Sequence, residues 1–259
     1  MDLGLQGKVA IVTGATRGIG QAISRVLLDE GASVLGTGRS HASVEGAAVE
    51  TFEGRFHLTT CDLFDPSATA ALVDTAQSHF GRLDIVVNNA ASFGYRSLAE
   101  LNRDDWIGLV TQKLIASAEI IRAAIPYLAL SHQGAVVNIA GVAGWIPSGE
   151  SPHPGAVNAG ILNMTEFFAL RLASQGIRVN SVSPGDTRTD RREERLRKLQ
   201  DERGMSRALA EKELTSLIPL GRAVEPEEVA VAVAMLCSSR LGSVTGVNFL
   251  VDGGRRVGR

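Results

Sequence analysis

The sequence is poor in the residues on which several classes of protein depend. It has two cysteines in 259 residues, Cys61 and Cys237, and they lie far apart. This spacing fits neither a disulfide framework nor a structural metal site, so we expect no bound metal. The net charge of -2 comes from mixed signs. It gives no reason to expect nucleic acid or an anionic membrane as a partner.

Long apolar runs are also missing. The apolar segments are far shorter than the roughly 20 residues that a membrane-spanning helix needs. The opening residues, MDLGLQGKVAIVTG, lack the basic region, apolar run and cleavage site of a signal peptide. We therefore expect a cytoplasmic protein without membrane contact. The length suits one large domain, residues 1–259, with a substantial core.

Short buried or β-branched runs alternate with segments of helical periodicity. The expected strands span residues 8–13, 33–37, 55–60, 84–87, 135–139, 177–182 and 247–251. The expected helices span residues 19–30, 66–80, roughly 104–130, 156–174 and 226–238. This alternation predicts an α/β domain with a parallel sheet and helices on both faces.

One segment, about residues 188–215, departs from this composition because it is dense in Arg, Glu, Asp and Lys. One interpretation is a solvated pair of surface helices. The other is a mobile lid, since the segment follows a strand end, where open α/β sheets bind ligands. The two interpretations are compatible.

A glycine-rich loop follows the first expected strand, in the sequence TGATRGIG. Gly14 permits a tight turn, Gly18 leaves room for a pyrophosphate, and Gly20 allows close packing of helix on strand. The helix that begins here offers free N–H groups and a partial positive charge to phosphate. The strand before the loop and the helix after it supply the context that this motif needs. We therefore expect a dinucleotide site, although the spacing differs by one residue from the commonest fingerprint.

Six motifs in order resemble those of the short-chain dehydrogenase/reductase family, over essentially the full length. They are TGATRGIG, Cys61-Asp62-Leu63, Asn88-Asn89-Ala90 followed by Ala91 in place of glycine, the segment from Arg178 to Thr189, GRAVEPEEVA, and the late VDGG. The resemblance implies a Rossmann-type, doubly wound parallel sheet. It also implies cofactor contacts from Gly14, Thr16, Arg17, Gly18, Ile19, Gly20, Arg39, Asp62, Leu63, Asn89, Ala90, Pro184, Gly185, Thr187 and Thr189.

The end of the second strand favours NADP over NAD. An acidic residue there would bind the ribose 2′-hydroxyl of NAD, but the sequence has Gly38-Arg39. Arg39 and Arg17 suit a 2′-phosphate, because guanidinium groups pair well with phosphate. Binding of NAD remains possible, and Arg39 can also be read as a solvated turn residue.

The resemblance also implies a catalytic Asn, Ser, Tyr and Lys, and all four positions have changed. Lys113 stands at the asparagine, Gly141 at the serine, Pro154 at the tyrosine and Asn158 at the lysine. The sequence has two tyrosines, Tyr95 and Tyr127, and neither is near this segment. Loss of a positioned general acid typically costs on the order of 10²- to 10⁴-fold in rate.

Three hypotheses follow. The first is a pseudoenzyme that binds NADP and serves as a homo-oligomer or as the silent subunit of a hetero-oligomer with an active member of the family. The second is an NADP-dependent oxidoreductase with a relocated acid or base, for which His153 and Lys113 are candidates, or with an iminium-like substrate that needs no acid. The third is a non-redox lyase, isomerase or cyclase that binds a small molecule in the same pocket.

Overall fold

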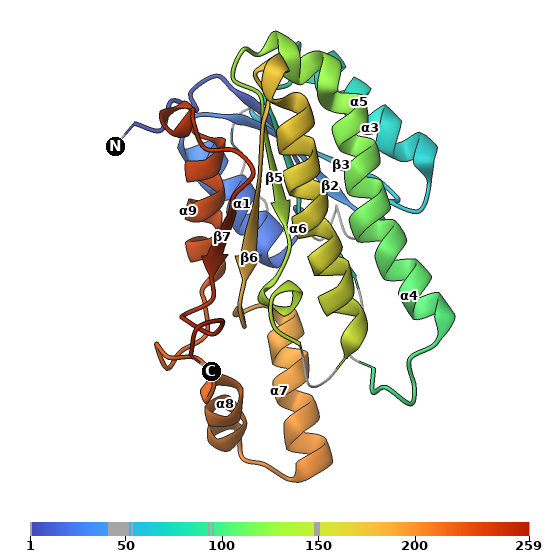
Figure 1. Ribbon diagram of the computed structural model, residues 1–259, viewed down its shortest axis with the longest axis vertical. Helices are drawn as coiled ribbons and strands as arrows, with labels where there is room; N and C mark the ends of the chain where they lie inside the picture. Colours follow the sequence, from blue (N-terminus) through green and yellow to red (C-terminus); the bar gives the residue numbers. More distant parts are fainter. Residues whose placement is uncertain are drawn as a thin grey trace.

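The computed structural model describes residues 2–40, 52, 54–92, 94, 96–147 and 151–258. Its strands form one parallel sheet of seven, in the order β3-β2-β1-β4-β5-β6-β7 (Figure 1). The strands are β1 (Val9–Val12), β2 (Ser33–Gly38), β3 (Phe56–Thr60), β4 (Ile85–Asn88), β5 (Ala135–Ile139), β6 (Arg178–Pro184) and β7 (Asn248–Val251). The predicted doubly wound α/β fold is confirmed.

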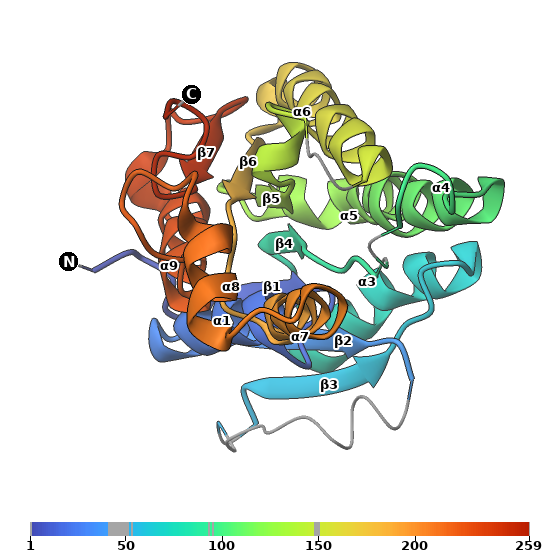
Figure 2. The same ribbon diagram turned by 90° about the horizontal axis from the view of Figure 1, so that it is seen from below.

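Helices cover both faces of the sheet (Figure 2). Helices α1 and α9 pack on one face, and α3, α5 and α6 pack on the other, each set enclosing its own apolar core. The α-helices are α1 (Gly18–Asp29), α3 (Pro66–Phe80), α4 (Arg103–Leu109), α5 (Ala116–Leu130), α6 (Pro152–Leu172), α7 (Asp190–Arg203), α8 (Arg207–Thr215) and α9 (Pro226–Cys237). Shorter turns are the π-helix η1 (Val110–Ile115) and the 3₁₀ turns η2 (Val142–Gly144), η3 (Ala173–Gln175) and η4 (Ser239–Leu241).

Most predicted boundaries lie within one or two residues of the observed ones, but α6 begins earlier than expected. The predicted start was residue 156, whereas the helix begins at Pro152 after an extended Ser151. Proline is favourable in a first helical turn, where its missing N–H has no partner to lose. Residues 153 and 154 therefore belong to the helix, which fixes their side chains relative to the sheet.

The order of strands reverses between β1 and β4, since β2 and β3 extend to one side and β5, β6 and β7 to the other. The crevice at such a reversal, beyond the carboxyl ends of the strands, is where open α/β sheets bind ligands. Four loops meet at this end, following β1, β4, β5 and β6. The loop after β1 is the glycine-rich loop, and the loops after β4, β5 and β6 contain Asn89, Gly141 and Gly185, respectively.

The charged segment forms the helix pair α7 and α8, which extends beyond this end of the sheet (Figure 1). A small apolar cluster of Leu196, Ala210 and Leu214 joins the two helices. The guanidinium of Arg192 is almost fully buried and donates to Asp186 at 2.8 Å and to Glu211 at 2.7 and 3.0 Å. The pair of surface helices is therefore as predicted, and Arg192 ties it to the end of β6. No helix in the described part of the chain is long and apolar enough to cross a membrane.

Candidate active site

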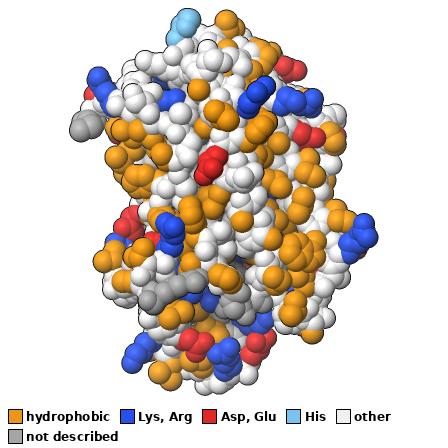
Figure 3. All heavy atoms as spheres, in the orientation of Figure 1, with side chains coloured by type: hydrophobic (Ala, Val, Ile, Leu, Met, Phe, Trp, Pro, Cys, Tyr) orange, Lys and Arg blue, Asp and Glu red, His pale blue; other side chains and the backbone are white. Residues whose placement is uncertain are grey.

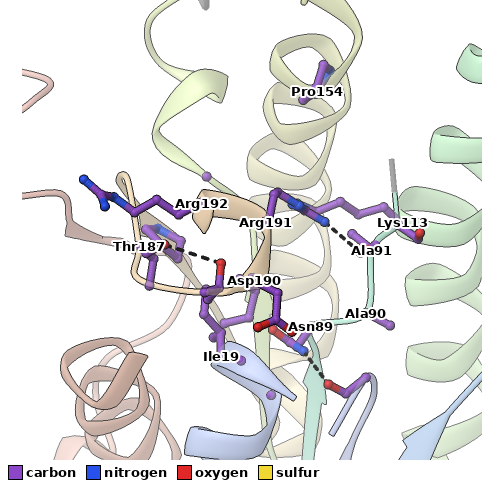
Figure 4. A pocket seen from close by; sticks show the side chains of 18 of the residues that line it. Ile19, Asn89, Ala90, Ala91, Lys113, Pro154, Thr187, Asp190, Arg191 and Arg192 are labelled. Atoms are coloured by element: carbon purple, nitrogen blue, oxygen red, sulfur yellow. Dashed lines mark hydrogen bonds between the residues drawn. The ribbon is translucent and has the colours of Figure 1, made fainter. Parts of the chain in front are cut away.

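A large cavity of about 1210 Å³ lies at the carboxyl ends of the strands. Its walls come from the glycine-rich loop, the ends of β2, β4, β5 and β6, the first turns of α6, and the helix pair α7–α8. Figure 4 shows the part where η1, α6 and α7 approach one another. The cavity is lined by both Arg39, after β2, and Pro154, in α6. It can therefore hold a dinucleotide together with a small second ligand.

The glycine-rich loop has the geometry expected for a phosphate cradle. Gly14 and Gly18 both have positive φ, at 67° and 55°. A Cβ on Gly20 would lie 2.1 Å from the carbonyl oxygen of Gly14, so no other residue fits there. The N-terminus of α1 opens onto the cavity, with Thr16, Arg17 and Ile19 beside it. The backbone thus supplies the donors and the space that a pyrophosphate requires.

The loop after β4 holds the cradle in place. The side-chain amide of Asn89 donates to the carbonyl oxygens of Thr13 and Gly14 at 2.9 and 3.2 Å. In return, Thr13 Oγ1 accepts from the backbone N–H groups of Asn89 and Ala90 at 2.9 and 3.0 Å. These bonds fix β1 against β4 at the switch point. Asn89 therefore holds the glycine-rich loop in place and also lines the cavity.

The other predicted cofactor residues also line the cavity, in two groups. Arg39, Asp62 and Leu63 lie toward the ends of β2 and β3, and Pro184, Gly185, Thr187 and Thr189 follow β6. Arg17 is exposed and pairs loosely with Asp190 on α7, at 3.4 Å. Arg39 is likewise exposed at the mouth. Both guanidinium groups are thus exposed in the cavity wall, where an anionic ligand can reach them.

The centre of the site is a contact that joins two of the four changed positions. Lys113 lies in η1 and Asn158 in α6, and Nζ of Lys113 donates to Oδ1 of Asn158 at 2.6 Å. The same Nζ donates to the carbonyl oxygen of Ala140, beyond β5, at 2.9 Å. Both side chains are more than nine-tenths buried, yet both line the cavity. A π-helix at this point is typical of functional sites, because the extra residue in the turn redirects side chains.

Burial, together with the positive charge of Arg191 on α7, lowers the pKa of Lys113 to about 7. Within the described residues, both hydrogen-bond acceptors of Nζ are neutral oxygens. An ammonium has three N–H donors, so one remains for a ligand in the cavity. Figure 4 shows Arg191 and Lys113 extending toward each other beside Ala91, whose carbonyl oxygen accepts from Arg191 at 3.1 Å.

Gly141 is small because Asn158 occupies the space beside it. A Cβ on Gly141 would lie 2.7 Å from Nδ2 of Asn158. Pro154 lines the same cavity one turn before Asn158 and has no ionisable group. The changes at 141 and 158 are therefore coupled by packing.

His153, the other candidate for an acid or base, points elsewhere. Its ring is 1% exposed, packs edge-on against Trp106 at 5.9 Å, and shares a hydrogen bond of 2.9 Å with Ser151. It is not among the residues that line the cavity, and burial lowers its pKa. Tyr127 contacts Asp74 on the outer surface, and Tyr95 lies outside the described residues.

Comparison with known proteins gives the family. A family model described as enoyl-(acyl carrier protein) reductase matches residues 14–256. The chain is 30% identical to the 3-oxoacyl-[acyl-carrier-protein] reductase of Vibrio cholerae, over 97% of this chain and 98% of that one. The chain belongs to the short-chain dehydrogenase/reductase family. It is also 33% identical to a hydroxy-methyl-oxo-hexahydroindene-carboxyl-CoA reductase of Mycobacterium tuberculosis, over 93% of this chain and 90% of the relative.

Solved structures agree. The L-sorbose reductase of Gluconobacter frateurii, complexed with NADPH and L-sorbose, has a TM-score of 0.93 at 27% identity and covers 99% of both chains. The ligand-free aldohexose dehydrogenase of Thermoplasma acidophilum has a TM-score of 0.88 at 26% identity, over 99% of this chain and 97% of that one. Both are short-chain oxidoreductase folds, and the first carries the cofactor predicted here.

These comparisons correct the functional expectation. The first hypothesis, a pseudoenzyme that serves as the silent partner of an active subunit, is wrong, because the full-length relatives are oxidoreductases. The same relatives favour neither a non-redox reaction nor an unusual substrate over ordinary carbonyl and alcohol chemistry. The error came from counting four changed residues one by one, since the sequence does not show that two of them touch.

Sequence reasoning also missed Arg191. Its position in a charged segment suggested a solvated residue, but it reaches over the cavity to Ala91 and adds positive charge beside Lys113. Its place two residues after Thr189, a predicted cofactor residue, was the available signal.

Proposed function

We propose that the protein is an NADP(H)-dependent oxidoreductase that interconverts a carbonyl group and an alcohol on a small molecule. The observation that carries the proposal is the continuity of one cavity. It joins a complete dinucleotide cradle at Gly14, Gly18 and Gly20 to a buried ammonium at Lys113. The reductase activity of the full-length relatives supports the same reaction class.

The cofactor preference rests on charge at the end of β2. Arg39 directly follows β2, Arg17 lies in the glycine-rich loop, and both line the cavity. An acidic residue that would contact a ribose 2′-hydroxyl is missing from the Gly38-Arg39 sequence. Guanidinium groups bind the 2′-phosphate of NADP, which NAD lacks. NADPH is the cofactor in the sorbose reductase complex.

When bound, NADPH supplies a hydride to the carbonyl carbon and becomes NADP⁺. The carbonyl oxygen then gains negative charge and finally a proton that comes from solvent. The protein's own part is to hold the two reactants in line and to stabilise that oxygen. Lys113 is a buried ionisable group in the wall of the cavity, and Arg191 of α7 reaches to the carbonyl oxygen of Ala91 beside it.

We further propose that the chain is a divergent member of its family. Lys113, Gly141, Pro154 and Asn158 stand where the resemblance places Asn, Ser, Tyr and Lys. The segment of about residues 188–215 acts as the lid. The coupled packing of Gly141 with Asn158 supports replacement of the site as a unit rather than its decay.

The test is a titration followed by a turnover assay. Calorimetry with NADPH and NADH should show tighter binding of NADPH. The assay then adds 3-oxoacyl thioesters or keto sugars, the substrate types named for the relatives, and follows the loss of NADPH absorbance as the cofactor is oxidised. If the protein binds NADPH but oxidises it with none of these carbonyl compounds, the proposal is contradicted.

We also propose that the protein is a cytoplasmic homo-oligomer. Ile107, Ile115, Phe167 and Leu170, from α4, η1 and α6, are exposed apolar residues on the outside of the α4–α6 layer. Figure 3 shows hydrophobic side chains spread over the face that α6 presents. Light scattering should give a mass above that of one chain, and Phe167→Glu with Leu170→Glu should reduce it. A single-chain mass for the unaltered protein would contradict the assembly.

A further inference from the structure

We propose that Lys113 and Asn158 have exchanged roles between η1 and α6, so that Lys113 supplies the catalytic cation and Asn158 is its positioning residue. This inference rests on the proposed function and deepens it. The resemblance places an asparagine at 113 and a lysine at 158, and the chain has the same two residue types in the opposite order.

The geometry shows that the exchange keeps the ammonium in the site. Because Nζ of Lys113 lies 2.6 Å from Oδ1 of Asn158, the charge from η1 reaches the side chain at position 158. A second bond, to the carbonyl oxygen of Ala140, fixes Nζ at the carboxyl end of β5. The third N–H is left for an oxygen in the cavity, which Lys113 lines.

Asn158 suits the positioning role. Its Oδ1 accepts from Lys113, and its Nδ2 lies over Gly141, where a Cβ would be 2.7 Å away. Any larger residue at 141 would displace this amide. Gly141 therefore belongs to the same arrangement, since it leaves the space that Asn158 needs in order to hold Lys113.

The chemical consequence is electrostatic. When a hydride reaches the carbonyl carbon, the oxygen gains negative charge. An ammonium within hydrogen-bonding distance therefore stabilises this oxygen more in the transition state than in the bound substrate. Lys113 is buried, so water screens this interaction little. Arg191 on α7 adds a second positive charge beside Lys113, which further favours the negatively charged oxygen of the transition state.

The experiment is a reversal of the exchange. The variants are Lys113→Asn, Asn158→Lys and the double variant that carries both, assayed for NADPH-dependent reduction and for NADPH affinity. Lys113→Gln is a second single variant that keeps a donor near Ala140, in case Lys113→Asn folds poorly. Lys198→Asn is the matched control, because Lys198 is an exposed lysine on α7 that does not line the cavity.

We expect Lys113→Asn and Lys113→Gln to lower kcat by about 10²- to 10³-fold, as removal of one donor to a developing oxyanion does. Asn158→Lys should also be slow, because it places two ammonium groups side by side. The double variant should recover at least tenfold over either single variant, and Lys198→Asn should match the unaltered protein. A purely structural role for the pair would move stability but would not give this recovery of kcat.

Two results are distinguishable failures. An active unaltered protein whose rate is the same in Lys113→Asn and Lys113→Gln, or a double variant no faster than the product of the single effects, overturns the exchange alone. An unaltered protein that binds NADPH but reduces none of the carbonyl compounds overturns the proposed function and this inference with it.

Discussion

The side chains of Lys113 and Asn158 lie 45 residues apart in sequence and meet at 2.6 Å in the wall of the cavity. One comes from the π-helix η1 and the other from the second turn of α6. Their contact turns two separate substitutions into one arrangement that keeps a positive charge where hydride chemistry needs it. Most of the expected behaviour of this protein follows from that charge and from the cradle beside it.

The first prediction concerns the pH dependence of the reaction. The pKa of Lys113 is lowered to about 7 by burial and by Arg191. The other charged groups that line the cavity on the α7 side are Asp186, Asp190, Arg192, Glu194 and Arg195. Since only the ammonium stabilises the oxygen, kcat/KM for reduction should be constant below about pH 7 and fall above it by up to about tenfold per unit.

Initial rates at limiting substrate, measured across this range, test the prediction. Lys113→Gln should be slow and nearly independent of pH over the same interval, because its amide does not titrate. A decline of equal size in Lys113→Gln would assign the titration to another group.

The second prediction concerns stability. A lysine whose pKa is lowered on folding binds more protons unfolded than folded between about pH 7 and its ordinary range, so stability rises with pH across that window. Below about pH 7 the full cost of burying the ammonium is present. Lys113→Met removes that cost, so its gain in melting temperature should be largest at about pH 6 and shrink toward about pH 9. Scanning calorimetry at both values checks this, and a constant difference would contradict it.

The third prediction concerns the choice of cofactor. Arg39→Asp removes a guanidinium that faces the β2 end of the cavity and adds a carboxylate suited to a ribose 2′-hydroxyl. The dissociation constant for NADPH should rise about 10- to 100-fold, and that for NADH should fall. Arg122→Asp, an equal charge change at an exposed position of α5, is the control. If both variants keep the original NADPH to NADH ratio, Arg39 has no part in selection.

The cradle and the fold could be predicted because their signals are local. The loop from Gly14 to Gly20 follows a strand and opens a helix within a dozen residues, and each segment reveals its own periodicity. The contact of Lys113 with Asn158 could not be predicted in this way, because it depends on the extra residue in η1 and on a helix start at Pro152. His153 illustrates the same limit. Adjacent to Pro154 in sequence, its side chain packs against Trp106 and not in the cavity.

A fourth prediction tests the cradle by adding one methyl group. Gly20→Ala would place a Cβ 2.1 Å from the carbonyl oxygen of Gly14, so the loop must shift. We expect a loss of about 1–3 kcal/mol in stability and a clear loss of NADPH affinity. Gly108→Ala in α4 is the control, because its Cβ would meet nothing closer than 4.0 Å, and alanine should stabilise that helix by about 0.5–1 kcal/mol. Equal NADPH affinity in the two variants would show that the loop does not bind the cofactor.

A fifth prediction concerns the attachment of α7 and α8. Arg192 is buried between Asp186 and Glu211. Its replacement by Gln removes the closest partner of both carboxylates and leaves them only the longer contacts, at 3.8 Å, with Arg195 and Arg207. Unfolding free energy should fall by about 2 kcal/mol or more. Arg203→Gln breaks the exposed pair with Glu213 in the same segment and should cost less than about 1 kcal/mol. Denaturant titration of both variants compares them, and equal losses would contradict the anchoring role of Arg192.

The most direct test of the account follows the hydride itself. NADPH carrying deuterium at both hydrogen positions of C4 would be incubated with the protein and a carbonyl substrate that it reduces, and the alcohol product would be examined by mass spectrometry and NMR. We expect one deuterium on the carbinol carbon of the product. Lys113→Asn should lower the rate at which this product forms, and the double variant with Asn158→Lys should recover part of that loss. Product without deuterium, or no product while NADPH stays bound and unoxidised, would contradict the account.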